Sequence, residues 1–302
     1  MGKDSAYYKD KKKKQTLKLR ELMSQLPGCA KDFLYDKEMT SQTSTLVSYA
    51  YDLLTFFRYL QYSNPTFANK SMTNFTMEDL AKLTSEDISE YQRYLELNVD
   101  GEKHENGKKA IARKMAPLRG MFLYHLEHEH IEKNPMILVK LPRIKKDKNI
   151  IRMNENEVAD VLNTVEFGNA QMSKHQLAFR ERTRERDLAI MTLMLGTGIR
   201  VSECVGLDLQ DIDFKNNGIT VTRKGGNQMV VYFGEEVENA LKTYLYTTRK
   251  ETVPLSGHEN ALFLSTQRKR MGVQAVENMV KKYAREVTPN KKITPHKLRS
   301  TY

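Results

Sequence analysis

The stretch Gly196-Thr197-Gly198-Ile199-Arg200-Val201-Ser202-Glu203 decides how the second half of this 302-residue chain is organised. It follows the apolar helical segment Leu188 to Leu195, and two glycines this close end a helix and let the backbone turn sharply. A new helix is expected to start near Arg200, with its first N–H groups facing the same space as the guanidinium, which predicts an anion site. Glu203 is predicted to orient Arg200, although such pairs are more often surface ion pairs.

Two later segments add groups of matching chemistry. Residues 219–233 predict two β-branched strands around a Gly-Gly-Asn turn, a hairpin with Lys224 at its tip. In Thr294-Pro295-His296-Lys297-Leu298-Arg299 the proline favours a helix start. His296 and Arg299 then share one helical face, because they lie three residues apart.

The ordered set Arg200, Lys224, His296 and Arg299 resembles the catalytic residues of the tyrosine recombinases, the phage-integrase and Xer-type family. The resemblance extends from about Leu17 to Tyr302 and includes residues 198–203, the Lys-Gly-Gly hairpin, residues 261–265 and residues 295–299. Each motif is weak alone, and their combination is specific.

The resemblance implies a role for each residue. Arg200 and Arg299 would stabilise charge on the nonbridging phosphate oxygens, since guanidinium stays charged and presents a fork of donors. Lys224 would protonate the departing 5′ oxygen, and His296 would hold the phosphate or assist proton transfer. Glu203 would orient Arg200. Neither a metal nor another cofactor is expected.

The family's nucleophile is a tyrosine that forms a 3′-phosphotyrosine link, and it lies two helices beyond the His-x-x-Arg motif. Here Tyr302 follows Arg299 by only three residues, too close for that role, and Ser300 replaces the more usual histidine. We therefore expect a chain truncated before its nucleophile, one that binds DNA without cleaving it.

Composition supports a soluble protein that approaches a polyanion. Hydrophobic residues make up 39% and charged residues 29%, with a net charge of +11 and a pI near 9.4. A merely basic solvated surface is the alternative. Cys29 and Cys204 suggest neither a disulfide framework nor a metal site, and no segment has membrane-spanning length, so a cytoplasmic location is expected.

The predicted fold is mainly α with a small antiparallel β-sheet. Residues 1–16 form a basic arm, residues 17–138 a helical core-binding DNA domain of the SAM-like type, and residues 139–152 a basic linker. Residues 153–302 form a mixed α+β catalytic domain, C-terminally incomplete. Helices are predicted at 17–26, 44–60, 77–83, 85–95, 108–130, 154–165, 235–246 and 273–285, and a short buried strand at 261–265. The Arg-rich stretch 171–186 receives no assignment.

Basic residues on the third main helix and in the linker are the candidate DNA contacts, although a charged helix face is usually just solvated. They are Lys108, Lys109, Arg113, Lys114, Arg119, Lys140, Arg143, Lys145, Lys146 and Lys148. His125, His128 and His130 are attributed to the favourable C-terminal end of a helix dipole rather than to a metal.

The sequence therefore predicts a site-specific DNA recombinase with double-stranded DNA as its partner, a homotetramer on DNA when full length and a monomer off it. The alternatives are a noncatalytic DNA-binding protein derived from a recombinase and a generic basic helical protein.

Overall fold

The computed structural model describes residues 6–68, 70–97, 106–144, 152–168, 172–223, 226–289 and 291–301. Contacts divide the chain into a first unit, Lys9–Lys146, and a second unit that comprises Asp147–Tyr302 with Met1–Tyr8. The division after Lys146 falls inside the stretch predicted as linker. Within the described ranges, none of the helices carries an apolar stretch that would cross a bilayer.

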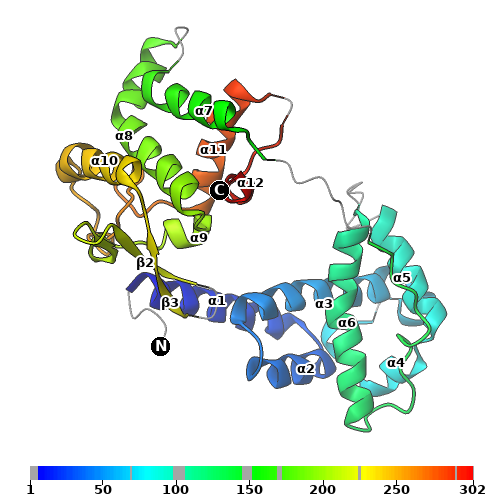
Figure 1. Ribbon diagram of the computed structural model, residues 1–302. Coiled ribbons are helices and arrows are strands. Elements are labelled where there is room, and N and C mark those ends of the chain that lie inside the picture. Colours follow the sequence, from blue (N-terminus) through cyan, green and yellow to red (C-terminus); the bar gives the residue numbers. More distant parts are fainter. Residues whose placement is uncertain are drawn as a thin grey trace. The chain divides into compact units, whose positions relative to one another are not determined.

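The first unit is a helical bundle (Figure 1). Its helices are α1 (Ala6–Gln25), α2 (Gly28–Glu38), α3 (Thr43–Ser63), α4 (Met77–Lys82), α5 (Ser85–Leu97) and α6 (Lys108–Glu127), with 3₁₀ turns at Pro65–Phe67 and Met72–Asn74. The apolar stripe predicted for α3 is buried, and so is the stripe of α6. Phe56 of α3 contacts Tyr91 of α5 and Phe122 of α6 edge to face, which ties these three helices into one core.

Two predictions for this unit need correction. Residues 6–16, expected to form an arm without structure, continue α1 as helix. Lysine is a good helix former, so the lysine run extends the helix that Leu19, Leu22 and Met23 anchor in the core. Helix α2 was not predicted at all, although Phe33 and Leu34 bury its inner face.

The histidine cluster lies where α6 ends, three residues earlier than predicted. His125 is fully buried, and its Nε2 lies 2.9 Å from the carbonyl oxygen of Cys29. Because a carbonyl only accepts, Nε2 carries the proton, and the neutral ring then accepts at Nδ1 from Nδ1 of His130, 3.0 Å away. Among the described residues, no group of three or more possible ligands is arranged to hold a metal.

The second unit joins helices to a small sheet (Figure 1). Its elements are α7 (Glu155–Phe167), α8 (Lys174–Thr197), α9 (Val201–Cys204), a 3₁₀ turn (Leu209–Asp211), β1 (Ile212–Asp213), β2 (Gly218–Thr222), β3 (Gln228–Tyr232), α10 (Glu235–Tyr244), a π turn (Leu245–Arg249), α11 (Val273–Val287) and α12 (Pro295–Thr301). The antiparallel sheet has the order β1-β2-β3, with Ile219 opposite Val231. The predicted fold class is confirmed.

Helix α8 is the central element of this unit and the largest departure from prediction. It absorbs the unassigned stretch 171–186 from Lys174 onward, and Ser173 and Gln176 form a capping box at its start. Residues 189–194 are buried on every side. The strand predicted at 261–265 is also wrong: the segment is largely buried, but it makes only isolated bridges, Asp208 with Ala261 and Leu264 with Arg270.

A buried ion pair within α8 is hydrogen-bonded to a tyrosine of α11. Asp187 accepts from Nε and Nη2 of Arg186 at 2.9 and 2.6 Å and from the hydroxyl of Tyr283 at 3.1 Å. Arg186 also donates from Nη1 to the carbonyl of Leu264 at 3.0 Å. Burial raises the pKa of Asp187, against the opposing effect of Arg186. Removing either charged partner leaves the other charge buried alone.

We predict that Asp187→Ala lowers the free energy of unfolding by about 3–5 kcal/mol, because it strands the Arg186 guanidinium in the interior. Urea unfolding followed by circular dichroism measures this. Glu277→Ala, which breaks a partly exposed pair with Lys281 on α11, is the matched control and should cost only about 0.3–0.5 kcal/mol. An Asp187→Ala loss as small as that of the control would contradict the prediction.

We also predict a pH effect in the first unit, since burial holds the pKa of His125 below its ordinary value. The unfolded chain then binds the proton more readily, so stability falls as pH drops below about 6.5, by at most roughly 1.4 kcal/mol per pH unit. His125→Gln keeps a donor and an acceptor without titrating. Thermal unfolding of both proteins between pH 8 and 5 should diverge at acid pH, and parallel curves would refute the effect. His130, His128 and Asp32 also act on this ring.

Candidate active site

The turn between α8 and α9 determines the position of Arg200. Gly198 closes α8 in the left-handed region, with φ 59° and ψ 22°, and its N–H donates to the carbonyl of Met194 at 3.1 Å. A side chain at this backbone conformation would be strained. Ile199 then enters the core, and Arg200 becomes the residue that precedes α9. The predicted glycine turn is therefore present.

Glu203 holds Arg200 by backbone and side chain together. Its Oε2 accepts from the Arg200 backbone N–H at 2.8 Å, and its Oε1 accepts from Nη1 at 2.7 Å. Only 3% of the Glu203 side chain is exposed, against 47% for Arg200. The carboxylate thus holds the guanidinium at Nη1, while about half of the arginine side chain remains exposed.

Cys204, the next residue, offers no competing nucleophile. It is fully buried in the core, and burial raises the pKa of its thiol to about 12. A thiol of this kind stays protonated at neutral pH and unreactive.

Helix α12 carries the second pair of predicted residues. The carbonyl of Thr294 accepts from the N–H groups of Lys297 and Leu298 at 2.8 and 3.0 Å, which starts the helix at Pro295. Leu298 is buried, so the helix is anchored on that face. His296 is exposed and Arg299 is partly exposed.

The elements that carry these residues share packing partners. Helices α9 and α12 both pack against α8 and α11, and α9 also contacts β2. Figure 1 shows α9 and α12 at the same end of α8. The hairpin of β2 and β3 is closed by bonds from the N–H of Arg223 to Asn227 O and from the N–H of Gly226 to Arg223 O, at 2.8 and 3.0 Å. Lys224 lies outside the described residues.

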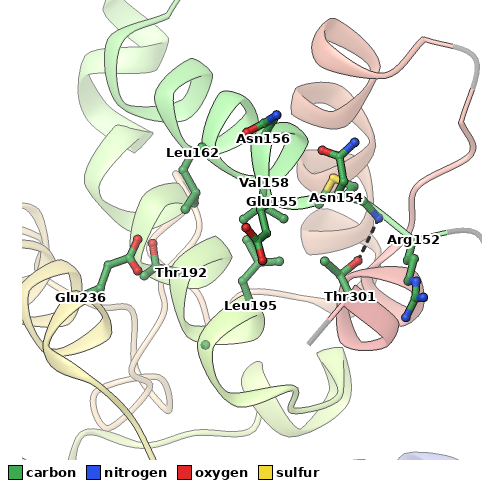
Figure 2. A pocket seen from close by; sticks show the side chains of 13 residues that line it. Arg152, Asn154, Glu155, Asn156, Val158, Leu162, Thr192, Leu195, Glu236 and Thr301 are labelled. Carbon is green, nitrogen blue, oxygen red and sulfur yellow. Dashed lines mark hydrogen bonds between the residues drawn. The ribbon is translucent and has the colours of Figure 1, made fainter.

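A cavity of about 900 Å³ lies between α7, α8, the start of α10 and the end of α12. Figure 2 shows Leu162, Leu195 and Thr192 along one part of it and the carboxylates of Glu155 and Glu236 around it. The N–H of Met153 donates to Thr301 Oγ1 at 3.1 Å and joins the last turn of α12 to the start of α7. Arg200, His296 and Arg299 do not line this cavity. Because Arg200 and His296 are exposed and Arg299 is partly exposed, the candidate site lies on the surface of this unit.

The candidate DNA contacts of the first unit differ in exposure. Lys108, Lys109, Arg119, Lys140 and Arg143 are exposed, whereas Lys145, Lys146 and Lys148 lie outside the described residues. Arg113 and Lys114 both approach Asp52 on α3, a partner that the sequence did not reveal. The one indication in the sequence of a buried partner for these cations was the single carboxylate of Asp52 next to the apolar residues Leu53 and Leu54.

Comparison with known proteins identifies the family of this chain. Residues 152–302 match the model of the phage integrase family. The tyrosine recombinase XerC of Caldanaerobacter subterraneus subsp. tengcongensis is 31% identical over 297 residues, which cover 95% of this chain and 78% of that protein. The tyrosine recombinase XerS of Streptococcus mutans serotype c is 30% identical over 308 residues, covering 94% and 85%. The chain therefore belongs to the phage integrase family of tyrosine recombinases.

Solved structures share the fold. The Tn1549 transposon integrase in complex with circular intermediate DNA has a TM-score of 0.61 at 20% identity, covering 90% of this chain and 84% of that one. The XerH site-specific recombinase bound to palindromic difH substrate has a TM-score of 0.61 at 19% identity, covering 87% and 69%. At this level of identity the likeness concerns the fold.

We predict that Glu203→Gln destabilises the second unit by about 1.5–3 kcal/mol, because the amide retains a single acceptor oxygen where two donors point. Urea unfolding measures the loss. Ser202→Ala, one residue earlier in α9, should unfold within about 0.5 kcal/mol of the parent. If Glu203→Gln were equally neutral, the carboxylate would not be what anchors Arg200.

Proposed function

We propose that this protein is a site-specific DNA recombinase that cleaves and rejoins strands through a 3′-phosphotyrosine intermediate. The observation that carries the proposal is the half-exposed Arg200 held by buried Glu203, on a helix that shares its packing partners with the helix of His296 and Arg299. Two forked cations and an imidazole on neighbouring short helices suit one phosphate better than a small-molecule substrate.

In the proposed mechanism Arg200 and Arg299 converge on the scissile phosphate. Attack on a phosphodiester builds negative charge on the nonbridging oxygens, and preoriented guanidinium forks stabilise that charge without reorganising. His296 holds the phosphate or assists proton transfer. Glu203 acts through Arg200, and its direct bond to the guanidinium is the reason that we call it a positioning residue.

Lys224 is proposed as the acid that protonates the departing 5′ oxygen. The support is positional: the paired strands β2 and β3 end on either side of it, and β2 contacts α9. A primary ammonium on a flexible stem suits proton donation to a leaving oxygen.

Double-stranded DNA is the proposed substrate, and four copies of the full-length protein are proposed to assemble on it. The related integrase and XerH structures are described as complexes with DNA. We propose that the exposed residues Lys108, Lys109 and Arg119 contact phosphates. The net charge of +11 is consistent with attraction to the DNA backbone. We propose a cytoplasmic location, as for the DNA on which a recombinase of this kind would act.

We propose that Tyr302 is not the nucleophile, because it lies only three residues after Arg299. The second candidate function is a noncatalytic DNA-binding protein that keeps the cationic site. The reading frame after codon 302 separates the two: a continuation that encodes a tyrosine favours the enzyme, and a stop codon favours the binder.

The test selects a preferred duplex from a random library and places a nick within it. We expect residues 1–302 to bind it, with log affinity falling steeply against log salt, and to give no covalent product on a denaturing gel. The polypeptide made from any longer reading frame should give a covalent 3′ product. Arg200→Lys keeps the charge but loses the fork, so it should bind normally and cleave about 10²–10³-fold more slowly.

Two results would overturn the proposal. Absence of salt-dependent binding to duplex DNA would remove the DNA function altogether. A covalent product from residues 1–302 that disappears in Tyr302→Phe would show that the nucleophile has been assigned wrongly.

A further inference from the structure

A buried carboxylate in the first unit holds two of the candidate DNA-contacting cations. Asp52 on α3 is 3% exposed and accepts from Arg113 of α6 through both oxygens, Oδ2 from Nη1 at 2.6 Å and Oδ1 from Nη2 at 3.1 Å. Lys114 Nζ lies 3.6 Å from Oδ1. This is a two-pronged contact between helices that are 61 residues apart in sequence.

The two cations are presented differently. The Lys114 side chain is 16% exposed, whereas that of Arg113 is 55% exposed. Arg113 makes the close two-pronged contact with Asp52, while Lys114 lies farther from the carboxylate and is more deeply buried, so the three groups together carry one net positive charge. The carboxylate thus fixes the direction of the guanidinium, and the lysine restores the positive charge that the pair alone would lack. An ion pair that only joined two helices would not need its arginine to be half exposed.

A fixed arginine suits a base edge better than a phosphate. A phosphate contact depends on net charge. A carboxylate beside the arginine weakens such a contact, because its negative charge repels the DNA phosphates. A guanine edge offers two neutral acceptors, O6 and N7, whose recognition depends on the direction of the donors. Asp52 uses one N–H of each terminal nitrogen of Arg113, and the other donors of the planar group stay available.

The neighbours of Arg113 on α6 allow close approach. Lys109, one turn before it, and Ala116, nearly one turn after it, are both exposed. Ala112 beside it is also small. A helix with alanines around an arginine can enter the major groove, where a lysine at one end reaches the phosphates.

We propose that Arg113 is a specificity-determining residue that reads one guanine in the major groove, and that Asp52 is the positioning residue that fixes its guanidinium. The proposal rests on the DNA binding proposed above. It removes Lys114 from the direct DNA contacts and separates Arg113 from the phosphate-binding lysines.

The test compares the sequence preferences of variants in a selection from a random 30-base-pair duplex library. Arg113→Lys keeps the charge at an exposed position, so the protein should fold. We expect it to lose the preference for one G·C pair, with affinity for the parent's preferred duplex falling roughly 5- to 150-fold and affinity for random duplex little changed. Lys109→Ala is the matched control, and it should weaken both duplexes alike and leave the selected sequence unchanged.

Asp52→Asn tests the positioning role. Loss of the carboxylate frees Arg113 to contact phosphate, so binding to random duplex should tighten and its salt dependence should steepen by about 0.9 in log–log slope, while the same G·C preference weakens. A merely structural role would leave the G·C preference unchanged. If Asp52→Asn fails to fold, Arg113→Lys still decides the base-reading claim.

The outcomes are distinguishable. If the parent binds no duplex in a salt-dependent manner, the proposed function fails. If the parent selects a sequence and Arg113→Lys selects the same one with the same affinity ratio, the function stands and this inference is wrong.

Discussion

The contact between buried Glu203 and half-exposed Arg200 is the interaction on which the proposed active site depends. Desolvating a carboxylate is costly, and here a backbone N–H and a guanidinium offset that cost. Both donors belong to one residue, so a shift of the backbone at the start of α9 would break both bonds together. The orientation of the guanidinium is therefore tied to the helix start, and the helix start in turn needs the left-handed turn at Gly198.

Sequence periodicity predicted the elements that are buried on one side. Helices α3, α6 and α11 show one apolar stripe each, and each stripe is buried. Helix α8 could not be predicted in full, because its first turns are exposed, Leu177 and Phe179 included, while residues 189–194 are buried all round, which leaves no continuous stripe. The segment 261–265 has the composition of a strand, but it bridges Asp208, far away in the sequence, and its own neighbour Arg270 at single positions, so no continuous ladder forms.

The candidate catalytic residues were predicted from ordered motifs, and the two carboxylates that hold exposed arginines differ in how visible they were in the sequence. Glu203 was visible because it lies three residues from Arg200, within the same motif. Asp52 was not, because it reaches Arg113 across 61 residues. Sequence alone presents Arg113 and Lys114 as equal neighbours on a basic helix. Only the buried acid between two helices distinguishes an exposed, fixed arginine from a largely covered lysine.

The exposure of an arginine that is paired with a buried carboxylate determines whether its remaining N–H donors bond to the protein or can bind a ligand. The Arg270 side chain is buried and forms an ion pair with Asp208. It also donates to the carbonyls of Val205 and Leu207 at 3.0 and 2.7 Å, so its donors stabilise the fold. Arg113 instead remains half exposed and keeps donors for a ligand. Long-range attraction to DNA depends on the whole excess of cations, but discrimination between bases requires cations that cannot adjust to any phosphate. The contact between buried Asp52 and half-exposed Arg113 has the restraint that discrimination requires, and this is why the proposed base reading is placed there rather than on the freely exposed lysines of α6.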